Sequence, residues 1–268
     1  MTSEFSVRAR WNALLSDLLA LLWPGSCVAC GAPDRVCCEP CLAEIRGRDG
    51  EAPRPLERRL PRPERTALEL RAAGRYDGAL RAGLVAYKHA GRVGLAKPLG
   101  ARLGPVLGAA IAAAPEPPLV VAVPSRPARV RERGIRHLEP VIRTALRRCP
   151  PRGGTGLALR ALRTTRGRRS QVGLDRAARR CNAALVRVRR SHAGRVRGRA
   201  VVLVDDVCTS GATLSAAAEA LERAGARPVS AVSICVVEEN AEPGGSGARG
   251  SGRVPERRNG APGRRPPA

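Results

Sequence analysis

The sequence VVLVDDVCTSGATL, residues 201–214, carries the strongest structural signal in this chain. It begins with four consecutive apolar residues, a pattern typical of a strand that is buried on both faces of a parallel sheet. Two aspartates follow, and a turn of small and hydroxyl-bearing residues then leads into an amphipathic helix. A strand, a turn and a helix in this order predict an α/β domain whose ligand binds where the strand ends.

The turn has the composition of a phosphate-binding loop. Backbone N–H groups at a helix N-terminus bind phosphate without a cationic side chain, and Gly211 allows the backbone to approach the ligand closely. Asp205 and Asp206 would repel phosphate, so we expect them to face sugar hydroxyls or a divalent metal ion. A 5-phosphorylated ribose satisfies both requirements. The turn is not a Walker loop, because no Gly-Lys-Ser/Thr is present. The alternative is an ordinary strand–turn–helix with aspartate caps. In a phosphate-binding loop, the hydroxyl groups that donate hydrogen bonds to the phosphate would be those of Thr209, Ser210 and Thr213.

The rest of the main domain alternates apolar strands with helices. This alternation predicts a mostly parallel sheet flanked by helices. Pro105 lies inside one expected helix and would kink or split it. The expected strands are 119–123, 200–204 and 229–237, and the expected helices are 78–87, 95–114, 137–148, 175–184 and 212–224.

Two Cys-x-x-Cys hooks near the start of the chain have the spacing of an N-terminal zinc knuckle. The ligands would be Cys27, Cys30, Cys38 and Cys41, although Cys37 could replace Cys38. Four thiolates complete the coordination shell of Zn²⁺, so the role of the metal would be structural. An odd total of nine cysteines favours reduced thiols over a disulfide framework, and therefore a cytoplasmic protein.

Changes in composition divide the chain into segments. The apolar run near the N-terminus has helical spacing, and Asn12, Ser16 and Asp17 interrupt it, so we expect a docking helix rather than a signal peptide. A lipoprotein anchor at Cys27 is the alternative. No run reaches the about 18–20 apolar residues of a membrane span. The expected segments are an amphipathic docking helix (1–24), the zinc knuckle (25–46), a linker (47–65), the main domain (66–239) and a disordered basic tail (240–268).

The chain is strongly basic, with 48 Lys and Arg against 23 Asp and Glu and a formal net charge of +25. Much of this charge gathers in residues 158–200 and in a shorter cluster at 126–136. One interpretation is a solvated, arginine-rich surface, because the chain is also rich in Ala, Gly and Pro. A field of this size also attracts polyanions such as phosphates and nucleic acid. Nucleic acid and acidic membrane surfaces are therefore candidate partners.

Residues 201–214 are similar to the phosphoribosyl-pyrophosphate (PRPP) motif of type I phosphoribosyltransferases. The chain as a whole resembles the ComF/GntX-type amidophosphoribosyltransferase-like proteins, which are linked with competence for DNA uptake. The resemblance spans about residues 27–237 and implies the type I phosphoribosyltransferase fold. Its other supporting features are the four-cysteine start, Tyr87-Lys88-His89-Ala90-Gly91-Arg92, Val123-Pro124-Ser125, Arg133-Gly134 and the segment 171–182.

The resemblance also implies roles for individual residues. Asp205 and Asp206 would be the catalytic pair that binds the ribose 2- and 3-hydroxyls, and Mg²⁺ would accompany PRPP. Ser125 and Arg126 would lie in the turn that holds pyrophosphate. The PRPP loop would comprise Val207, Cys208, Thr209, Ser210, Gly211, Ala212 and Thr213, and the mobile lid would include Arg163, Gln171 and Arg180.

Two functions are compatible with these features. We expect an enzyme that transfers ribosyl-5-phosphate from PRPP to an unknown base or amine and releases pyrophosphate. The alternative is a non-catalytic single-stranded DNA binding module of the competence machinery, with a DNA-uptake helicase or motor protein as a further partner. Such modules stack bases on aromatic side chains, and the main domain has only Tyr76 and Tyr87. Arg136-His137 stands where Asn-Gln is common in the family, and no histidine is assigned a role.

Overall fold

The computed structural model describes residues 25–33, 35–47, 55–62, 65–125, 130–131, 134, 136–148, 155–165 and 186–237. Three expectations lie outside these residues. They are the docking helix at 1–24, the helix at 175–184 and the tail at 240–268.

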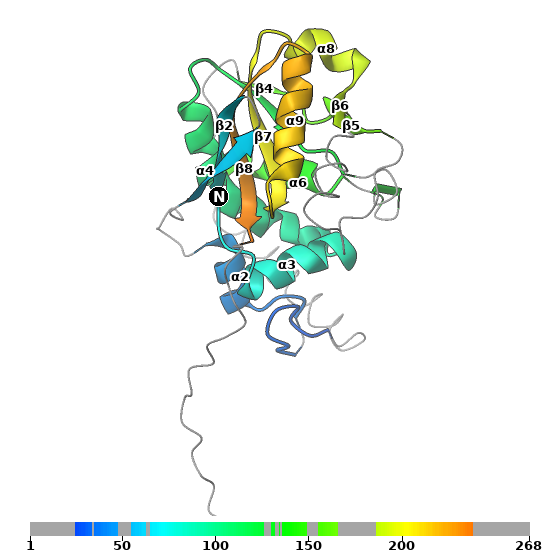
Figure 1. Ribbon diagram of the computed structural model, residues 1–268. Helices are drawn as coiled ribbons and strands as arrows, with labels where there is room; N and C mark the ends of the chain where they lie inside the picture. Colours follow the sequence, from blue (N-terminus) through cyan, green and yellow to red (C-terminus); the bar gives the residue numbers. More distant parts are fainter. Residues whose placement is uncertain are drawn as a thin grey trace, which may run out of the picture. The chain divides into compact units, whose positions relative to one another are not determined.

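Within the described residues, six strands form one sheet at the centre of the domain (Figure 1). In spatial order they are β1 (Leu56–Arg62), β2 (Arg65–Ala72), β8 (Arg227–Val236), β7 (Ala200–Cys208), β3 (Leu119–Ala122) and β4 (Gly156–Leu157). β7 is parallel to both of its neighbours, β3 and β8, as its apolar run predicts. Only β1 and β2 pair in antiparallel fashion, at one edge of the sheet. The sheet is therefore mostly parallel.

Helices cover both faces of this sheet. Side chains alternate between the faces along a strand, so Val202 and Val204 of β7 enter one apolar cluster and Val201 and Leu203 enter the other. The first cluster contains residues of α3 (Gly78–His89), α4 (Ala96–Ala112) and α6 (Leu138–Arg148), and the second contains residues of α9 (Ala212–Arg223). In Figure 1, α9 runs along β7 and β8. The expected sheet with flanking helices is confirmed.

The cysteine-rich segment is part of this domain. Its helix, α2 (Glu39–Arg46), packs against α3 and α4. Cys27, Cys41 and Ile45 belong to the same buried apolar cluster as α3 and α4. The knuckle therefore shares a core with the sheet domain.

The segment expected to be a linker, 47–65, contains the edge strand β1. The expectation was wrong for 56–62 because β1 has the sequence LERRLPR, in which arginines mask the alternation of buried and exposed positions. Leu60 is fully buried and Leu56 is partly buried against the same cluster as α9. Backbone pairing with β2 and the burial of these two apolar side chains hold β1 at the edge of the sheet.

Two further differences concern element boundaries. α4 continues through Pro105 as a single helix, and β7 extends past the expected end at residue 204 to Cys208. Among the helices of the described residues, none has both the length and the hydropathy needed to cross a membrane. The remaining elements are η1 (Val93–Leu95), α8 (Arg190–Val196) and a separate antiparallel pair, β5 (Leu162–Thr164) with β6 (Val186–Val188).

Candidate functional site

The two predicted carboxylates lie inside the last part of β7 and not after it. The backbone N–H of Asp206 donates to Asp205 Oδ1 at 2.8 Å, which ties the Asp205 side chain to the strand. Because side chains alternate along a strand, Asp206 follows Val202 and Val204 toward the α3 and α6 face. Asp205 belongs to the opposite row, on the side of α9. The pair therefore presents carboxylate oxygens on both sides of the strand end.

The predicted phosphate loop connects β7 to α9 and rests on β1. Gly211 directly precedes α9 and has φ +75°, in the left-handed region that favours glycine. A Cβ at this position would overlap Leu60 Cδ2 of β1. The Arg58 guanidinium, also on β1, donates to the Thr209 carbonyl oxygen at 2.7 Å. Ser210 precedes Gly211, and Ala212 and Thr213 begin α9. The contacts from Leu60 and Arg58 show that β1, a strand that the sequence did not predict, holds the loop in shape.

Replacing Gly211 with alanine is expected to lower the free energy of unfolding by about 1–3 kcal/mol, because both the backbone conformation and Leu60 oppose a methyl group. Chemical denaturation followed by circular dichroism measures the change. Gly91→Ala is the matched control, since Gly91 also has positive φ but no atom lies within 4 Å of its Cβ position. Equal losses in the two variants would show that the contact with Leu60 does not matter.

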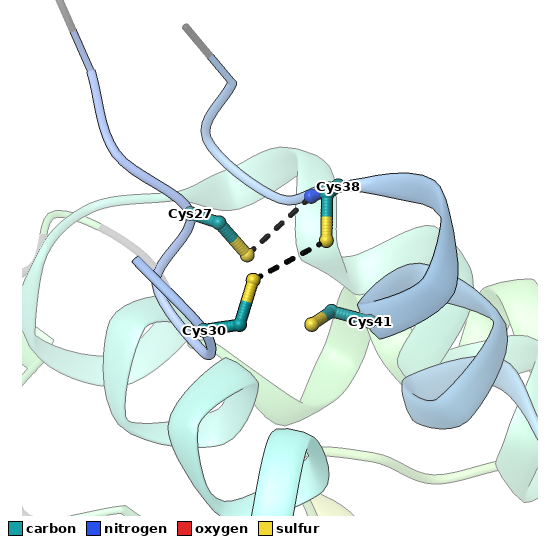
Figure 2. A group of neighbouring side chains, drawn as sticks. All are labelled: Cys27, Cys30, Cys38 and Cys41. Atoms are coloured by element: carbon teal, nitrogen blue, oxygen red, sulfur yellow. Dashed lines mark hydrogen bonds between the residues drawn. The ribbon is translucent and has the colours of Figure 1, made fainter. Parts of the chain in front are cut away.

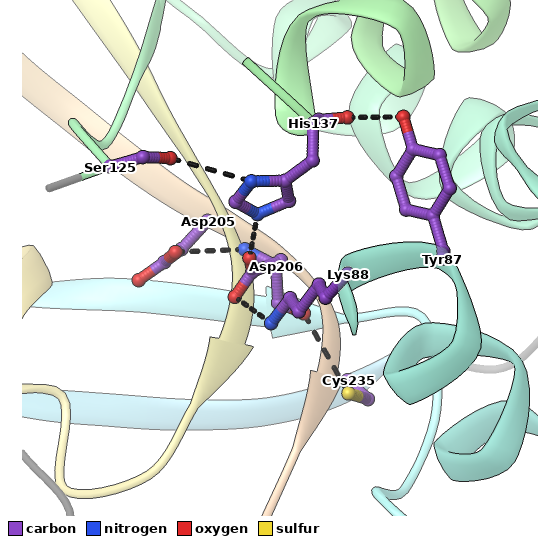
Figure 3. A network of polar contacts seen from close by, with 7 residues as sticks. All are labelled: Tyr87, Lys88, Ser125, His137, Asp205, Asp206 and Cys235. Atoms are coloured by element: carbon purple, nitrogen blue, oxygen red, sulfur yellow. Dashed lines mark hydrogen bonds and ion pairs between the residues drawn. The ribbon is translucent and has the colours of Figure 1, made fainter. Parts of the chain in front are cut away.

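Asp206 is the centre of a partly buried polar network (Figure 3). Lys88 Nζ, from the last turn of α3, lies 2.8 Å from Asp206 Oδ1. His137, immediately before α6, pairs through Nε2 with Asp206 Oδ2. The other ring nitrogen of His137, Nδ1, lies 3.4 Å from Ser125 Oγ. The Tyr87 hydroxyl donates to the His137 carbonyl oxygen at 2.6 Å, so α3 fixes both partners of the carboxylate.

The electrostatics of this network keep Asp206 ionised. Burial alone would raise the pKa of Asp206, but the Lys88 ammonium and the hydrogen bond from His137 outweigh it and hold that pKa well below its usual range. Burial raises the pKa of the Tyr87 hydroxyl to about 12, so this group remains a donor. Burial and the nearby charge of Asp206 raise the pKa of the Cys235 thiol. Asp206 is therefore the anion of the network.

A carboxylate whose pKa is depressed by folding stabilises the protein above its unfolded pKa of about 3.9, and this stabilisation is lost as the pH falls. The free energy of unfolding should therefore fall from about pH 5 downward. Lys88→Met is expected to make this fall shallower and to destabilise the protein by about 1–3 kcal/mol at neutral pH. Denaturant titrations at several pH values measure both effects. Lys97→Met removes an exposed lysine on α4 and should match the wild type in both measurements. If the free energy of unfolding of Lys88→Met depended on pH as in the wild type, Lys88 would not be the group that lowers the pKa of Asp206.

The structure describes only some of the other predicted site residues. The structure brings Ser125 to the network, whereas Arg126, Gln171 and Arg180 lie outside the described residues. Arg163 is exposed in β5, which pairs with β6.

Sequence reasoning missed Lys88 and His137 as site residues. Lys88 stood in the segment 87–92, which carried the resemblance, whereas Arg136-His137 was a departure from it. No spacing rule connects either residue with Asp206, and the departure at His137 was the available signal.

The side chains of the four predicted cysteine ligands point toward one another (Figure 2). The Sγ atoms of Cys27, Cys30, Cys38 and Cys41 lie within 4.8 Å of one another, and the pair Cys30–Cys38 is 3.5 Å apart. Tetrahedral thiolates at a Zn–S distance of about 2.3 Å are about 3.8 Å apart, so this donor set fits a zinc ion. Cys37 is not part of the group, so the geometry favours Cys38 as the fourth donor.

Comparison with known proteins agrees with the strand–loop–helix geometry. Residues 149–255 match the family model described as phosphoribosyl transferase domain. The match includes β7, the loop, α9 and β8. A search of curated proteins finds no match for the chain.

Proposed function

We propose that this chain, of which residues 149–255 match the family model described as phosphoribosyl transferase domain, binds PRPP and transfers its ribosyl-5-phosphate group to a nitrogen acceptor. The main support is the end of β7, where two carboxylates precede a loop that enters α9 through a left-handed glycine. The backbone N–H groups of the loop would hold the 5-phosphate. Asp205 and Asp206 would accept hydrogen bonds from the two ribose hydroxyls.

The reaction is a displacement at the anomeric carbon. A bond from the acceptor nitrogen to this carbon forms, the bond to the pyrophosphate oxygen breaks, and pyrophosphate leaves with the electron pair. The acceptor nitrogen then loses a proton. Because the transition state resembles an oxocarbenium ion, the protein contributes most by holding the sugar phosphate in place and by stabilising charge on the leaving group.

Lys88 and His137 supply cationic and hydrogen-bonding groups at this site. Both contact Asp206 and so offset the cost of burying most of its carboxylate. On binding, the ribose hydroxyls would replace these contacts. Ser125 Oγ lies 3.4 Å from His137 Nδ1. Its hydroxyl would donate a hydrogen bond to the leaving pyrophosphate. Asp205 offers the carboxylate oxygens that Mg²⁺ prefers. When bound with PRPP, Mg²⁺ would neutralise charge on the diphosphate.

The zinc knuckle has a structural role in this proposal. Cys27, Cys30, Cys38 and Cys41 would hold one Zn²⁺ with no position left for substrate.

A second candidate function is single-stranded DNA binding, which an open groove beside α6 favours. The groove has a volume of about 670 Å³. Glu139 in its wall is already paired with Arg160 at 2.9 Å and with Arg136 at 3.6 Å. The remaining cations of the groove, which would suit a phosphate backbone, are Lys97, Arg143 and Arg147. DNA binding would connect the protein with DNA uptake in the cytoplasm.

Release of pyrophosphate separates the two functions. The enzyme is expected to release pyrophosphate from Mg·PRPP only when an acceptor base or amine is added, and a panel of nucleobases and amines can be screened with a coupled pyrophosphate assay. DNA binding alone would instead give salt-sensitive fluorescence anisotropy with an oligonucleotide. Arg143→Ala with Arg147→Ala would weaken that binding, whereas Asp205→Asn would not.

A further inference from the structure

We propose that Glu44, on the knuckle helix α2, is a positioning residue for the Asp206 site and acts through α3. The proposal rests on the proposed function in one respect, namely that the Asp206 site binds PRPP. It assigns to the cysteine knuckle a role in shaping the phosphoribosyl site, in addition to its role in stability.

The Glu44 carboxylate caps the first turn of α3. The backbone N–H of Ala79 donates to Glu44 Oε1 at 2.9 Å, whereas Asp77, at the N-cap position itself, makes no side-chain cap hydrogen bond. Gly78 has φ +45°, and a Cβ at this position would lie 2.6 Å from Glu44 Oε1. A carboxylate at a helix N-terminus satisfies an otherwise unpaired N–H group and interacts favourably with the helix dipole. The cap of α3 is thus supplied by a different helix, 35 residues earlier in the chain.

The packing of α2 prevents it from moving independently of α3. Ile45 is fully buried, and a Cβ at Gly83 in the middle of α3 would lie 2.7 Å from Ile45 Cδ1. Arg102 of α4 donates to the Glu44 carbonyl oxygen at 2.7 Å and to the Ala73 carbonyl oxygen at 2.9 Å. These contacts fix the end of α2 against both α3 and the sheet.

The other end of α3 enters the Asp206 network. Its last turn carries Tyr87, whose hydroxyl donates to the His137 carbonyl oxygen at 2.6 Å, and Lys88, whose Nζ lies 2.8 Å from Asp206. A helix of 12 residues is about 18 Å long and is stiff over that length. A shift of its first turn therefore changes the position of Lys88 and His137 relative to Asp206.

Loss of the Glu44 carboxylate should loosen the N-terminal turn of α3 and disturb the network at its far end. We expect Glu44→Ala to weaken binding of Mg·PRPP by about five-fold, the size of one lost cap hydrogen bond. Glu44→Gln keeps an oxygen acceptor at the same reach and should stay within about two-fold of the wild type. Glu39→Ala is the matched control, because Glu39 is an exposed acid on the same helix that pairs only weakly with Arg46 at 3.5 Å.

A purely structural cap would change stability without changing the site, so the test needs a direct signal from the network. The chain has three histidines, and the ring signals of His137 can be followed by NMR in the ligand-free protein with selectively labelled histidine. The proposal predicts that the His137 signals shift in Glu44→Ala and return toward the wild-type position in Glu44→Gln. If Glu44→Ala does not fold, Glu44→Asp, which keeps the charge but shortens its reach, should give the same shift.

The outcomes separate this proposal from the proposed function. Wild-type-like His137 signals in a folded Glu44→Ala or Glu44→Asp variant would overturn the role of Glu44, whether or not the protein binds PRPP. A wild-type protein that does not bind Mg·PRPP would overturn the proposed function, and the NMR comparison would still decide the role of Glu44.

Discussion

Replacing both Asp205 and Asp206 with asparagine is expected to weaken the binding of Mg·PRPP by about 100-fold. Each carboxylate would lose a charged hydrogen bond to a ribose hydroxyl, and such bonds contribute about 1.5–3 kcal/mol apiece. Isothermal titration calorimetry with Mg·PRPP measures the change directly. The loss should appear in the dissociation constant and not in the number of sites.

The control for this variant must remove the same charge elsewhere. The chain already has a formal net charge of +25, so the loss of two acids by itself increases the attraction for a polyanionic ligand. Glu57→Gln with Glu69→Gln removes two exposed acids from β1 and β2 and should bind at least as tightly as the wild type. Because the Asp206 change also leaves Lys88 and His137 without their anion, Asp205→Asn alone provides a second test. Unchanged affinity in both aspartate variants would remove the carboxylates from the proposed role.

The second large effect concerns the cysteine knuckle. The wild-type protein is expected to contain one Zn²⁺ per chain, and Cys38→Ser is expected to contain none, since three thiolates and a hydroxyl hold zinc much less tightly. Its melting temperature should fall strongly, because Cys27 and Cys41 lie in the same buried cluster as α3 and α4. Metal analysis of the purified protein and calorimetric melting measure the two quantities.

Cys37 provides a control within the same segment. It neighbours Cys38 in the sequence but lies outside the four-sulfur group, so Cys37→Ser should keep the metal and nearly all of the thermal stability. Retention of zinc by Cys38→Ser and its loss from Cys37→Ser would contradict the assignment of ligands.

The sequence was most informative where function and local pattern coincide. The run of four apolar residues before Asp205 predicted β7, the small residues after it predicted the loop, and the spacing of Leu214 and Leu221 predicted the buried face of α9. The two Cys-x-x-Cys hooks predicted the thiol cluster. Each of these signals lies within a few consecutive residues, which is the range over which periodicity and spacing rules apply.

The features that were not predicted depend on contacts between distant parts of the chain. Strand β1 is polar in sequence, and only its position beneath Gly211 shows why Leu60 is buried. Lys88 meets Asp206 from the last turn of α3, and His137 meets it from the residue before α6. A hydrogen bond from Ala79 to Glu44 joins α3 to the knuckle. Such pairings follow from the packing of whole elements on the sheet, which local patterns do not determine.

The crystal structure of the complex with Mg·PRPP tests the central claim most directly. The 5-phosphate is predicted to lie against the backbone N–H groups of residues 209–213, with the ribose hydroxyls on Asp205 and Asp206 and with Lys88 no longer paired with Asp206. A ligand bound elsewhere, such as in the arginine-lined groove beside α6, with the Lys88–Asp206 pair intact, would contradict the proposed function.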